Sequence, residues 1–211
     1  MRKVFITASM LSLFALLVGF SFSGTMDIGA NMPAADVEMQ ATDGSSYALK
    51  DLKGENGLLV IFSCNTCPFV VGGKDSEGWD GRYNGLYDQC KQLGFGMVLV
   101  NSNEAKRANG DSMEDMKAYS EENGLKSYYV LDKDHVVADA FEASTTPHVF
   151  LFGKELELKY KGAIDDNVES ADAVSEPWLS EALMALRGGK KIDPNETKNM
   201  GCSIKRVKKS E

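Results

Sequence analysis

Two cysteines lie three residues apart in the stretch Phe62-Ser63-Cys64-Asn65-Thr66-Cys67-Pro68-Phe69. The apolar run at residues 58–62, directly before it, is typical of a strand buried on both faces. Pro68 suits the first position of a helix, where a backbone N–H would have no partner in any case. The sequence therefore predicts a buried strand that ends near Ser63 and a helix that begins beside Cys67.

The position of Cys67 makes it the candidate nucleophile. At the N-cap of the predicted helix, unpaired N–H groups and the helix macrodipole favour a thiolate and so lower the pKa of Cys67. Cys64 is near enough in sequence to close a disulfide with Cys67, which makes it the candidate resolving thiol. A Cys-x-x-Cys pair between a strand and a helix indicates a redox site. The alternatives are a structural disulfide and two idle thiols.

Strand and helix patterns alternate along the rest of the chain. Further strands are predicted at residues 97–100, 128–131, 149–152 and 155–160, the last from strict alternation of polar and apolar residues. Helices are predicted at residues 83–93, 111–124, 134–141 and 175–187. Residues 37–49, with an Asp43-Gly44 turn, predict an N-terminal β-hairpin extension. This order predicts an α/β fold with a central mixed β-sheet flanked by helices.

The composition excludes several classes of protein. The chain has 211 residues, of which 43% are hydrophobic and 26% charged, as expected for a globular protein with one sizeable core. Asp and Glu total 31 against 23 Lys and Arg, giving a net charge of −8. An acidic chain has no general attraction for phosphate backbones or anionic lipids, so no nucleic-acid partner is expected. Four cysteines are too few for a small disulfide scaffold.

The N-terminal segment, residues 1–23, is predicted to be a signal peptide. Met1-Arg2-Lys3 is cationic, residues 4–20 are mostly apolar, and Ser21-Phe22-Ser23 supplies small residues for cleavage. The mature chain is then secreted or periplasmic, without stable insertion in the membrane, and its cysteine pairs can stay oxidised. The alternative is an uncleaved N-terminal anchor.

The remaining chain is divided into a domain and a tail. Residues 33–187 contain no repeat, low-complexity tract or linker, and are therefore predicted to form one redox domain. Residues 188–211 are polar and basic, and we expect them to form an extended tail over the surface.

Several motifs together resemble the thioredoxin superfamily, and within it the peroxiredoxin-like branch of redoxin-domain proteins related to AhpC/TSA. The resemblance extends over residues 33–207. Besides the Cys64–Pro68 stretch, it is carried by four motifs: Asn101-Ser102-Asn103, Thr145-Thr146-Pro147, Gly162-Ala163-Ile164-Asp165-Asp166-Asn167 and Gly201-Cys202-Ser203-Ile204-Lys205.

The resemblance implies a thioredoxin-like fold and thiol-based redox chemistry, with no metal or organic cofactor. It further implies that Pro147 is cis and faces the nucleophilic cysteine, and that Thr146 and Pro147 bind the backbone of an extended substrate. The substrates would be protein thiols and disulfides or small peroxides, and an electron-donor redox protein would act as partner.

The chain also departs from that family. Cys64 stands where peroxidatic sites carry a threonine, and the resolving position of thioredoxins falls on Val70. None of Arg82, Arg107 and Arg187 can be assigned to peroxide activation from the sequence. Peroxidase activity is therefore an open alternative beside disulfide exchange.

Other side chains compete for a role. Cys90 is expected in the core. For Cys202 the sequence leaves two roles open without favouring either: folding back as a resolving thiol, or pairing with Cys90. His148 is expected to be a half-exposed structural residue and His135 a surface residue. Trp79 lies in the glycine-rich stretch 72–81, expected to be a flexible insert, and is a candidate contact for a partner.

A second class of function uses the same residues. In a copper-binding or metallochaperone protein, Cys64 and Cys67 would supply the soft thiolates that suit Cu(I), and His148 would be a third ligand. A zinc site is not expected, since no second Cys-x-x-Cys completes four ligands.

Overall fold

A computed structural model describes residues 26–208 of the chain. The predicted signal peptide at residues 1–23 lies outside the described residues. Within residues 26–208, no helix is both long and apolar enough to cross a membrane.

The described chain is built on a seven-stranded mixed sheet. The strand order is β2-β1-β5-β4-β3-β7-β8, with β3, β4 and β5 parallel and the other neighbours antiparallel. The strands are β1 Met39–Ala41, β2 Ser46–Tyr47, β3 Gly57–Ser63, β4 Phe95–Asn101, β5 Tyr128–Leu131, β7 His148–Phe152 and β8 Leu158–Gly162. A separate two-stranded sheet joins β6 Thr145–Thr146 to β9 Cys202–Ser203. The predicted α/β fold, with its N-terminal hairpin, is confirmed.

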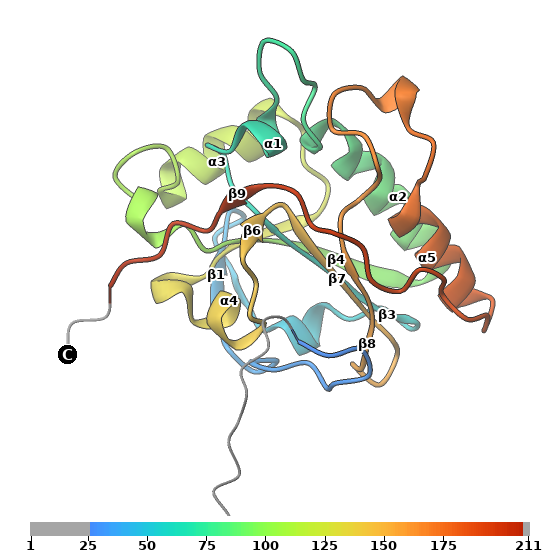
Figure 1. Cartoon of the computed structure of the whole chain (residues 1–211). Helices are drawn as coiled ribbons and strands as arrows, with labels where there is room; N and C mark the ends of the chain where they lie inside the picture. The colour runs from blue at the N-terminus through green and yellow to red at the C-terminus, as the bar shows by residue number, and fades with distance from the viewer. Residues whose placement is uncertain (1–25, 209–211) are drawn as a thin grey trace, which may run out of the picture.

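Helices cover both faces of the sheet (Figure 1). One face carries α1 Pro68–Val71, α2 Tyr83–Leu93, α3 Met113–Glu122 and α5 Trp178–Arg187, and the other carries α4 Val136–Ala140. Short 3-10 helices lie at η1 Leu49–Leu52, η2 Asp80–Arg82, η3 Glu104–Lys106, η4 Lys133–His135 and η5 Ala171–Ala173.

The central strand β3 is buried on both faces, as its unbroken apolar run predicts. Leu59 and Ile61 belong to the core beneath α2 and α5, whereas Leu58 and Val60 belong to the core beneath α4. Because successive side chains alternate across a strand, one short segment anchors two separate cores.

Two predicted elements are shorter than their patterns suggest, and the glycine-rich stretch from Gly72 interrupts the helix after Cys67, as expected. The strand expected at residues 155–160 begins only at Leu158, because residues 153–157 form the turn from β7. The helix expected at residues 134–141 is reduced to α4, since Asp134 and His135 have positive φ. The helix after Cys67 ends after one turn, at Gly72, whose φ of 76° suits glycine.

The C-terminal segment returns across the molecule after α5. Figure 1 shows it passing in front of the sheet, where β9 lies against β6. It therefore reaches the end of the molecule at which β3 stops and α1 begins.

Candidate active site

The Cys64–Cys67 loop joins β3 to α1. Strand β3 ends at Ser63, Cys67 is the N-cap residue, and Pro68 is the first residue of α1, as predicted. However, α1 has only four residues, so few peptide dipoles align behind Cys67. The helix macrodipole alone is therefore a weak reason for Cys67 to ionise.

Both thiols meet the loop that carries Thr146 and Pro147. The Cys67 thiol donates to the Thr146 carbonyl oxygen at 3.1 Å, and Cys64 Sγ lies 3.2 Å from Thr146 Oγ1. The Thr146–Pro147 peptide bond is cis. Cys64 is fully buried and Cys67 is only 3% exposed. The structure thus brings together all four residues that the sequence indicated for nucleophile, resolving thiol and substrate binding.

Hydrogen bonds among the thiols separate their ionisation. The bond from Cys64 is the main cause that lowers the pKa of Cys67, and Cys202 and Thr146 assist it against the effect of burial. The same bond, together with burial, raises the pKa of Cys64. The cluster therefore keeps a proton on Cys64 and favours the thiolate on Cys67. The pKa of Cys67 is lowered, as expected, but the main cause is the hydrogen bond from Cys64 and not the start of the helix.

Cys202 is the third thiol of this cluster. It lies opposite Thr146 in the β6–β9 pair, and its side chain and N–H both interact with Cys67. Burial and Cys67 raise the pKa of Cys202. Cys90, in contrast, lies on the buried face of α2, in the hydrophobic core, where burial raises its pKa to about 12. The expected core position of Cys90 is confirmed, and Cys202 contacts Cys67 rather than pairing with Cys90.

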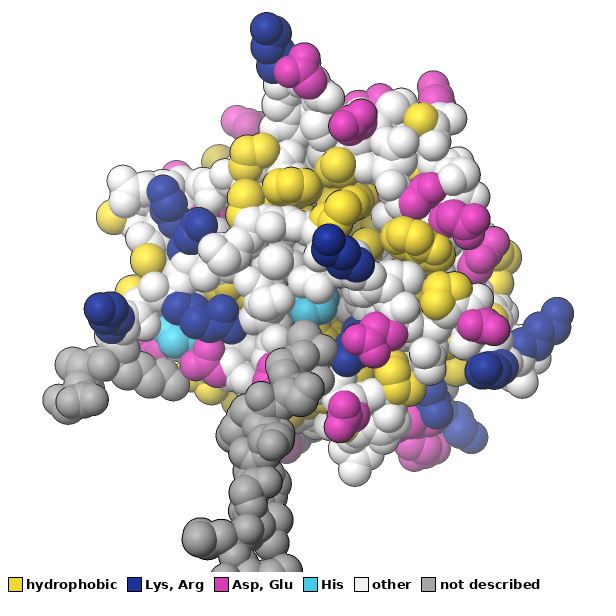
Figure 2. Space-filling view, in the orientation of Figure 1, with side chains coloured by type: hydrophobic (Ala, Val, Ile, Leu, Met, Phe, Trp, Pro, Cys, Tyr) yellow, Lys and Arg dark blue, Asp and Glu magenta, His cyan; other side chains and the backbone are white. Residues whose placement is uncertain are grey.

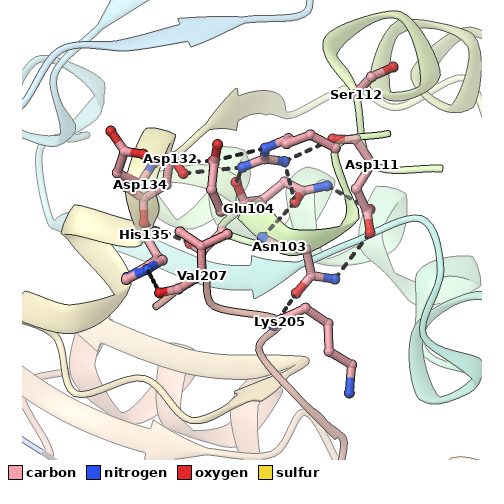
Figure 3. A network of polar contacts seen from close by, with 12 residues as sticks. Asn103, Glu104, Asp111, Ser112, Asp132, Asp134, His135, Lys205 and Val207 are labelled. Atoms are coloured by element: carbon pink, nitrogen blue, oxygen red, sulfur yellow. Dashed lines mark hydrogen bonds and ion pairs between the residues drawn. The ribbon is translucent and has the colours of Figure 1, made fainter. Parts of the chain in front are cut away.

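Asp111 holds the loop between the two cysteines, and the sequence analysis missed it. Its buried carboxylate accepts from the Asn65 N–H at 2.8 Å and the Thr66 hydroxyl at 2.8 Å. The side-chain amides of Asn101 and Asn103 donate to it at 2.9 and 3.1 Å, and Figure 3 shows the Asn103 contact. Four donors on one carboxylate fix the loop's position against β4.

The sequence carries only a weak signal of this role. Asn101 and Asn103 belong to a motif of the resemblance, but Asp111 has the place of an ordinary residue at the start of a helix. Ser112 is in fact the N-cap of α3, with a capping box to Asp115, which leaves Asp111 to turn inward.

Arg107 reinforces the same region from behind. Its guanidinium donates to the Asn101 side chain and to the backbone carbonyls of Asn101, Asp111 and Asp132, and it pairs with Glu104. These contacts occupy the donor fork of Arg107 with structural partners. Arg82 is paired with Asp165.

Several expected surface residues are buried. His148 is 1% exposed, and burial lowers its pKa to about 3, while His135 is 3% exposed and pairs with Asp139. Trp79 is fully buried and donates to Asp165, so the expectation that it contacts a partner is wrong. The insert that carries it is docked, because the N–H groups of residues 77 and 78 donate to the backbone of residues 169 and 168.

The copper hypothesis finds no preformed ligand set. Among residues 26–208, no three His, Cys, Asp or Glu side chains are grouped so that they could hold a metal ion. His148 instead receives a long hydrogen bond from the Ser144 N–H and packs on the Phe150 ring.

Comparison with known proteins fits this geometry. The model of the AhpC/TSA family matches residues 29–161. The chain belongs to the AhpC/TSA family. The thiol-disulfide oxidoreductase ResA of Bacillus subtilis is 27% identical over 165 residues, which cover 73% of this chain and 81% of that protein.

Solved structures give the same assignment of fold. An uncharacterized conserved protein from Geobacillus kaustophilus has 29% identity and a TM-score of 0.77, covering 88% of this chain and 94% of the other. Peroxidoxin BcpB from Mycobacterium tuberculosis shares the fold at 14% identity, with a TM-score of 0.52, covering 78% of this chain and 97% of the other. The fold is thioredoxin-like, and the family together with the thiol pair makes the chain a thiol-dependent oxidoreductase.

Proposed function

We propose that this oxidoreductase exchanges thiols and disulfides outside the cytosol, with Cys67 as nucleophile and Cys64 as resolving thiol. The observation that carries the proposal is the meeting of both thiols at Thr146, with a proton held on Cys64 and the thiolate favoured on Cys67. A pair with this division of roles suits a nucleophile and a thiol that is ionised later.

The first step is attack on a substrate disulfide. The Cys67 thiolate attacks one sulfur of the disulfide, forming a mixed disulfide and releasing the other sulfur as a thiolate. Ionised Cys67 no longer donates to the Thr146 carbonyl, so Cys64 and the Cys202 N–H are the donors that stabilise it.

The second step is resolution by Cys64. Once Cys67 is in a disulfide, its negative charge is gone, and Cys64 no longer has a thiolate to which it donates. Cys64 then loses its proton to the departing thiolate and attacks Cys67 Sγ, forming the Cys64–Cys67 disulfide and releasing the reduced substrate. An external dithiol donor returns the pair to its reduced form, so each turnover transfers two electrons.

Thr146 and Pro147 form the edge along which substrate would bind. Their backbone borders Cys67, so an extended polypeptide that pairs with β6 brings its own cysteine to the nucleophile. Half-buried Phe69 and Met200 pack against the core that also contains the two cysteines. Figure 2 shows apolar side chains gathered on this face, with charged groups around it, as suits a protein substrate.

Peroxide reduction is the second candidate, and membership of the AhpC/TSA family favours it. The Cys67 thiolate would attack the peroxide O–O bond to give a sulfenic acid and release an alcohol or water. Cys64 would then condense with that sulfenic acid and release water. Arg107 takes no part, because its guanidinium binds backbone carbonyls.

We place this activity outside the cytosol on the strength of the predicted signal peptide at residues 1–23. Residues 33–187 would supply the redox domain and residues 188–211 the tail. In that location the Cys64–Cys67 pair can persist as a disulfide between turnovers.

Trapping of a substrate tests the assignment of the two cysteines. Cys67→Ser should lower reduction of a peptide disulfide on the order of 10³-fold or more, as when an enzyme loses its nucleophile. The double variant Cys64→Ser with Cys202→Ser retains Cys67 without a neighbouring thiol, and should accumulate a mixed disulfide on it. Mass spectrometry would find the substrate on the tryptic peptide of residues 54–74.

Cys90→Ser is the control, since Cys90 is a core residue remote from this step, and it should turn over at the rate of the unaltered chain. Full turnover by Cys67→Ser would refute the proposal. A mixed disulfide trapped on Cys64 in Cys67→Ser would reverse the two roles.

A further inference from the structure

Strand β9 covers the thiol pair. Cys202 is directly opposite Thr146, and Thr145 opposite Ser203, in an antiparallel pair of two residues. Thr146 is the residue whose carbonyl accepts from Cys67. The strand edge beside the nucleophile is therefore already occupied by the chain's own C-terminal segment.

The contacts of Cys202 are those of a substrate cysteine. Its N–H and its side chain both interact with Cys67, and the Phe69 N–H at the start of α1 acts to lower the pKa of Cys202. Cys64 and Cys67 are almost wholly buried, whereas Cys202 is half-buried. Of these three thiols, Cys202 is the one in contact with both the nucleophile and the solvent.

The approach of β9 requires glycine beside Cys202. A Cβ on Gly201 would lie 2.3 Å from the Thr146 carbonyl oxygen, closer than any side chain tolerates. Glycine at this position lets the backbone come close enough for Cys202 to reach Cys67.

The network around Asp111 also anchors this strand. Asn103 donates to Asp111 with its amide nitrogen and accepts from the Lys205 N–H at 2.9 Å with its amide oxygen. Figure 3 shows Asn103 between Asp111 and Lys205. The same side chain therefore aligns the Cys64–Cys67 loop and the segment that carries Cys202.

We propose that β9 is a built-in substrate strand and that Cys202 is a third redox thiol, which forms a disulfide with Cys67 in the place of a substrate's cysteine. The proposal rests on the assignment of Cys67 as nucleophile. It adds a second resolving thiol to the proposed function, and it requires a protein substrate to displace residues 201–203 from β6.

The chemistry balances in the same way as resolution by Cys64. The Cys202 thiol passes its proton to the departing substrate sulfur and attacks Cys67 Sγ of the mixed disulfide, so the Cys67–Cys202 bond forms as the Cys67–substrate bond breaks and the substrate leaves as a thiol. If Cys67 is first oxidised by peroxide to a sulfenic acid, Cys202 condenses with it and water leaves.

Disulfide mapping of the full mature chain tests the proposal. Trypsin leaves Cys64 and Cys67 together on residues 54–74 and Cys202 on residues 199–205. The Cys64→Ser variant would be reduced, treated with one equivalent of hydrogen peroxide, quenched with N-ethylmaleimide and digested. We expect a disulfide between these two peptides as the main product. Cys90→Ser in the same background serves as control and should leave its yield unchanged.

A second variant tests the strand rather than the thiol. Gly201→Ala keeps every cysteine but pushes β9 from Thr146, and should lower the yield of the linked peptides severalfold. The proposal is overturned if Cys67 of Cys64→Ser is oxidised to a sulfenic or sulfinic acid, or links two chains, without joining residues 199–205. In that case the role of Cys67 as nucleophile stands. If Cys67 stays unoxidised by peroxide in every variant and also forms no mixed disulfide with a peptide disulfide, both this proposal and the proposed function fail.

Discussion

The Cys64–Cys67 loop and strand β9 approach Thr146 from different parts of the chain, and they are held in different ways. The loop is fixed by a buried carboxylate with four donors. Strand β9 is held by a ladder of two residues, by the half-buried Asn199 before it and by the Lys205 N–H after it, which donates to the buried Asn103.

This difference separates a rigid part of the site from an exchangeable one. Loss of a partner from a buried network leaves unsatisfied groups that cannot reach water, so such networks open rarely. The two-residue ladder and the Asn199 contacts lie nearer the surface and exchange with water at little cost, so β9 can open locally while the buried Lys205–Asn103 contact holds the segment that follows it. We therefore expect the geometry at Cys67, the proposed nucleophile, to survive displacement of β9.

Asp111→Ala, which removes the carboxylate that fixes the Cys64–Cys67 loop, should have the largest effect of the substitutions considered. It strands the Asn65 N–H and the amides of Asn101 and Asn103, so the free energy of unfolding should fall by about 3 kcal/mol or more. Urea denaturation would measure this loss, and disulfide exchange should fall with it.

Asp115→Ala is the matched control, because Asp115 closes the exposed capping box of α3. It should lower the free energy of unfolding much less than Asp111→Ala does and leave the exchange rate intact. Equal losses of stability and activity in the two variants would mean that Asp111 does not position the Cys64–Cys67 loop.

The pH dependence of Cys67 alkylation should show which of two causes lowers the pKa of Cys67: the hydrogen bond donated by Cys64, or the start of α1. A lowered pKa keeps Cys67 ionised as the pH falls below the usual thiol value of about 8.5, and its reactivity is lost only on passing the lowered pKa. Cys64→Ser keeps a hydroxyl donor, whereas Cys64→Ala removes it, and Cys67 is then the single thiol of residues 54–74 in both.

The midpoint for iodoacetamide labelling of residues 54–74 should therefore lie higher in Cys64→Ala than in Cys64→Ser. At a pH below both midpoints, each unit of separation lowers the labelling rate roughly tenfold. If the two variants gave the same labelling profile, the start of α1 and not the Cys64 donor would be the cause of the low pKa of Cys67.

Asn199→Ala should have the smallest effect and act on the cover alone. Its amide donates to the hydroxyls of Ser144 and Thr145, so its removal loosens the segment before β9. In the Cys64→Ser background, labelling of Cys67 should become roughly two- to tenfold faster, the equivalent of one hydrogen bond. The unfolding free energy should fall by the same amount, about 0.5–1.5 kcal/mol, which is well below the loss expected for Asp111→Ala.

Asn84→Ala removes comparable amide contacts, to the carbonyls of Asn123 and Gly124 at the far end of α3, and should leave labelling unchanged. An unaltered rate in Asn199→Ala would show that β9 does not limit access to Cys67.

Much of the fold was predictable because its signals are local. The apolar runs of β3 and β4 identify buried strands wherever they pack, and Pro68 marks a helix start from its own covalent geometry. The errors fall where local patterns are overruled: positive φ at Asp134 and His135 shortens the helix expected at residues 134–141, and Trp79 lies in the core, where its indole donates to Asp165.

By itself, the sequence determined the strand–Cys-x-x-Cys–helix junction, its order along the chain and the proline loop that faces it. The tertiary structure alone decided that Asp111 fixes the loop, that Cys64 rather than a helix dipole favours the Cys67 thiolate, and that Cys202 joins them. Helix and strand patterns are written in neighbouring residues, whereas the partner of a buried carboxylate or thiol depends on which distant segments fold together.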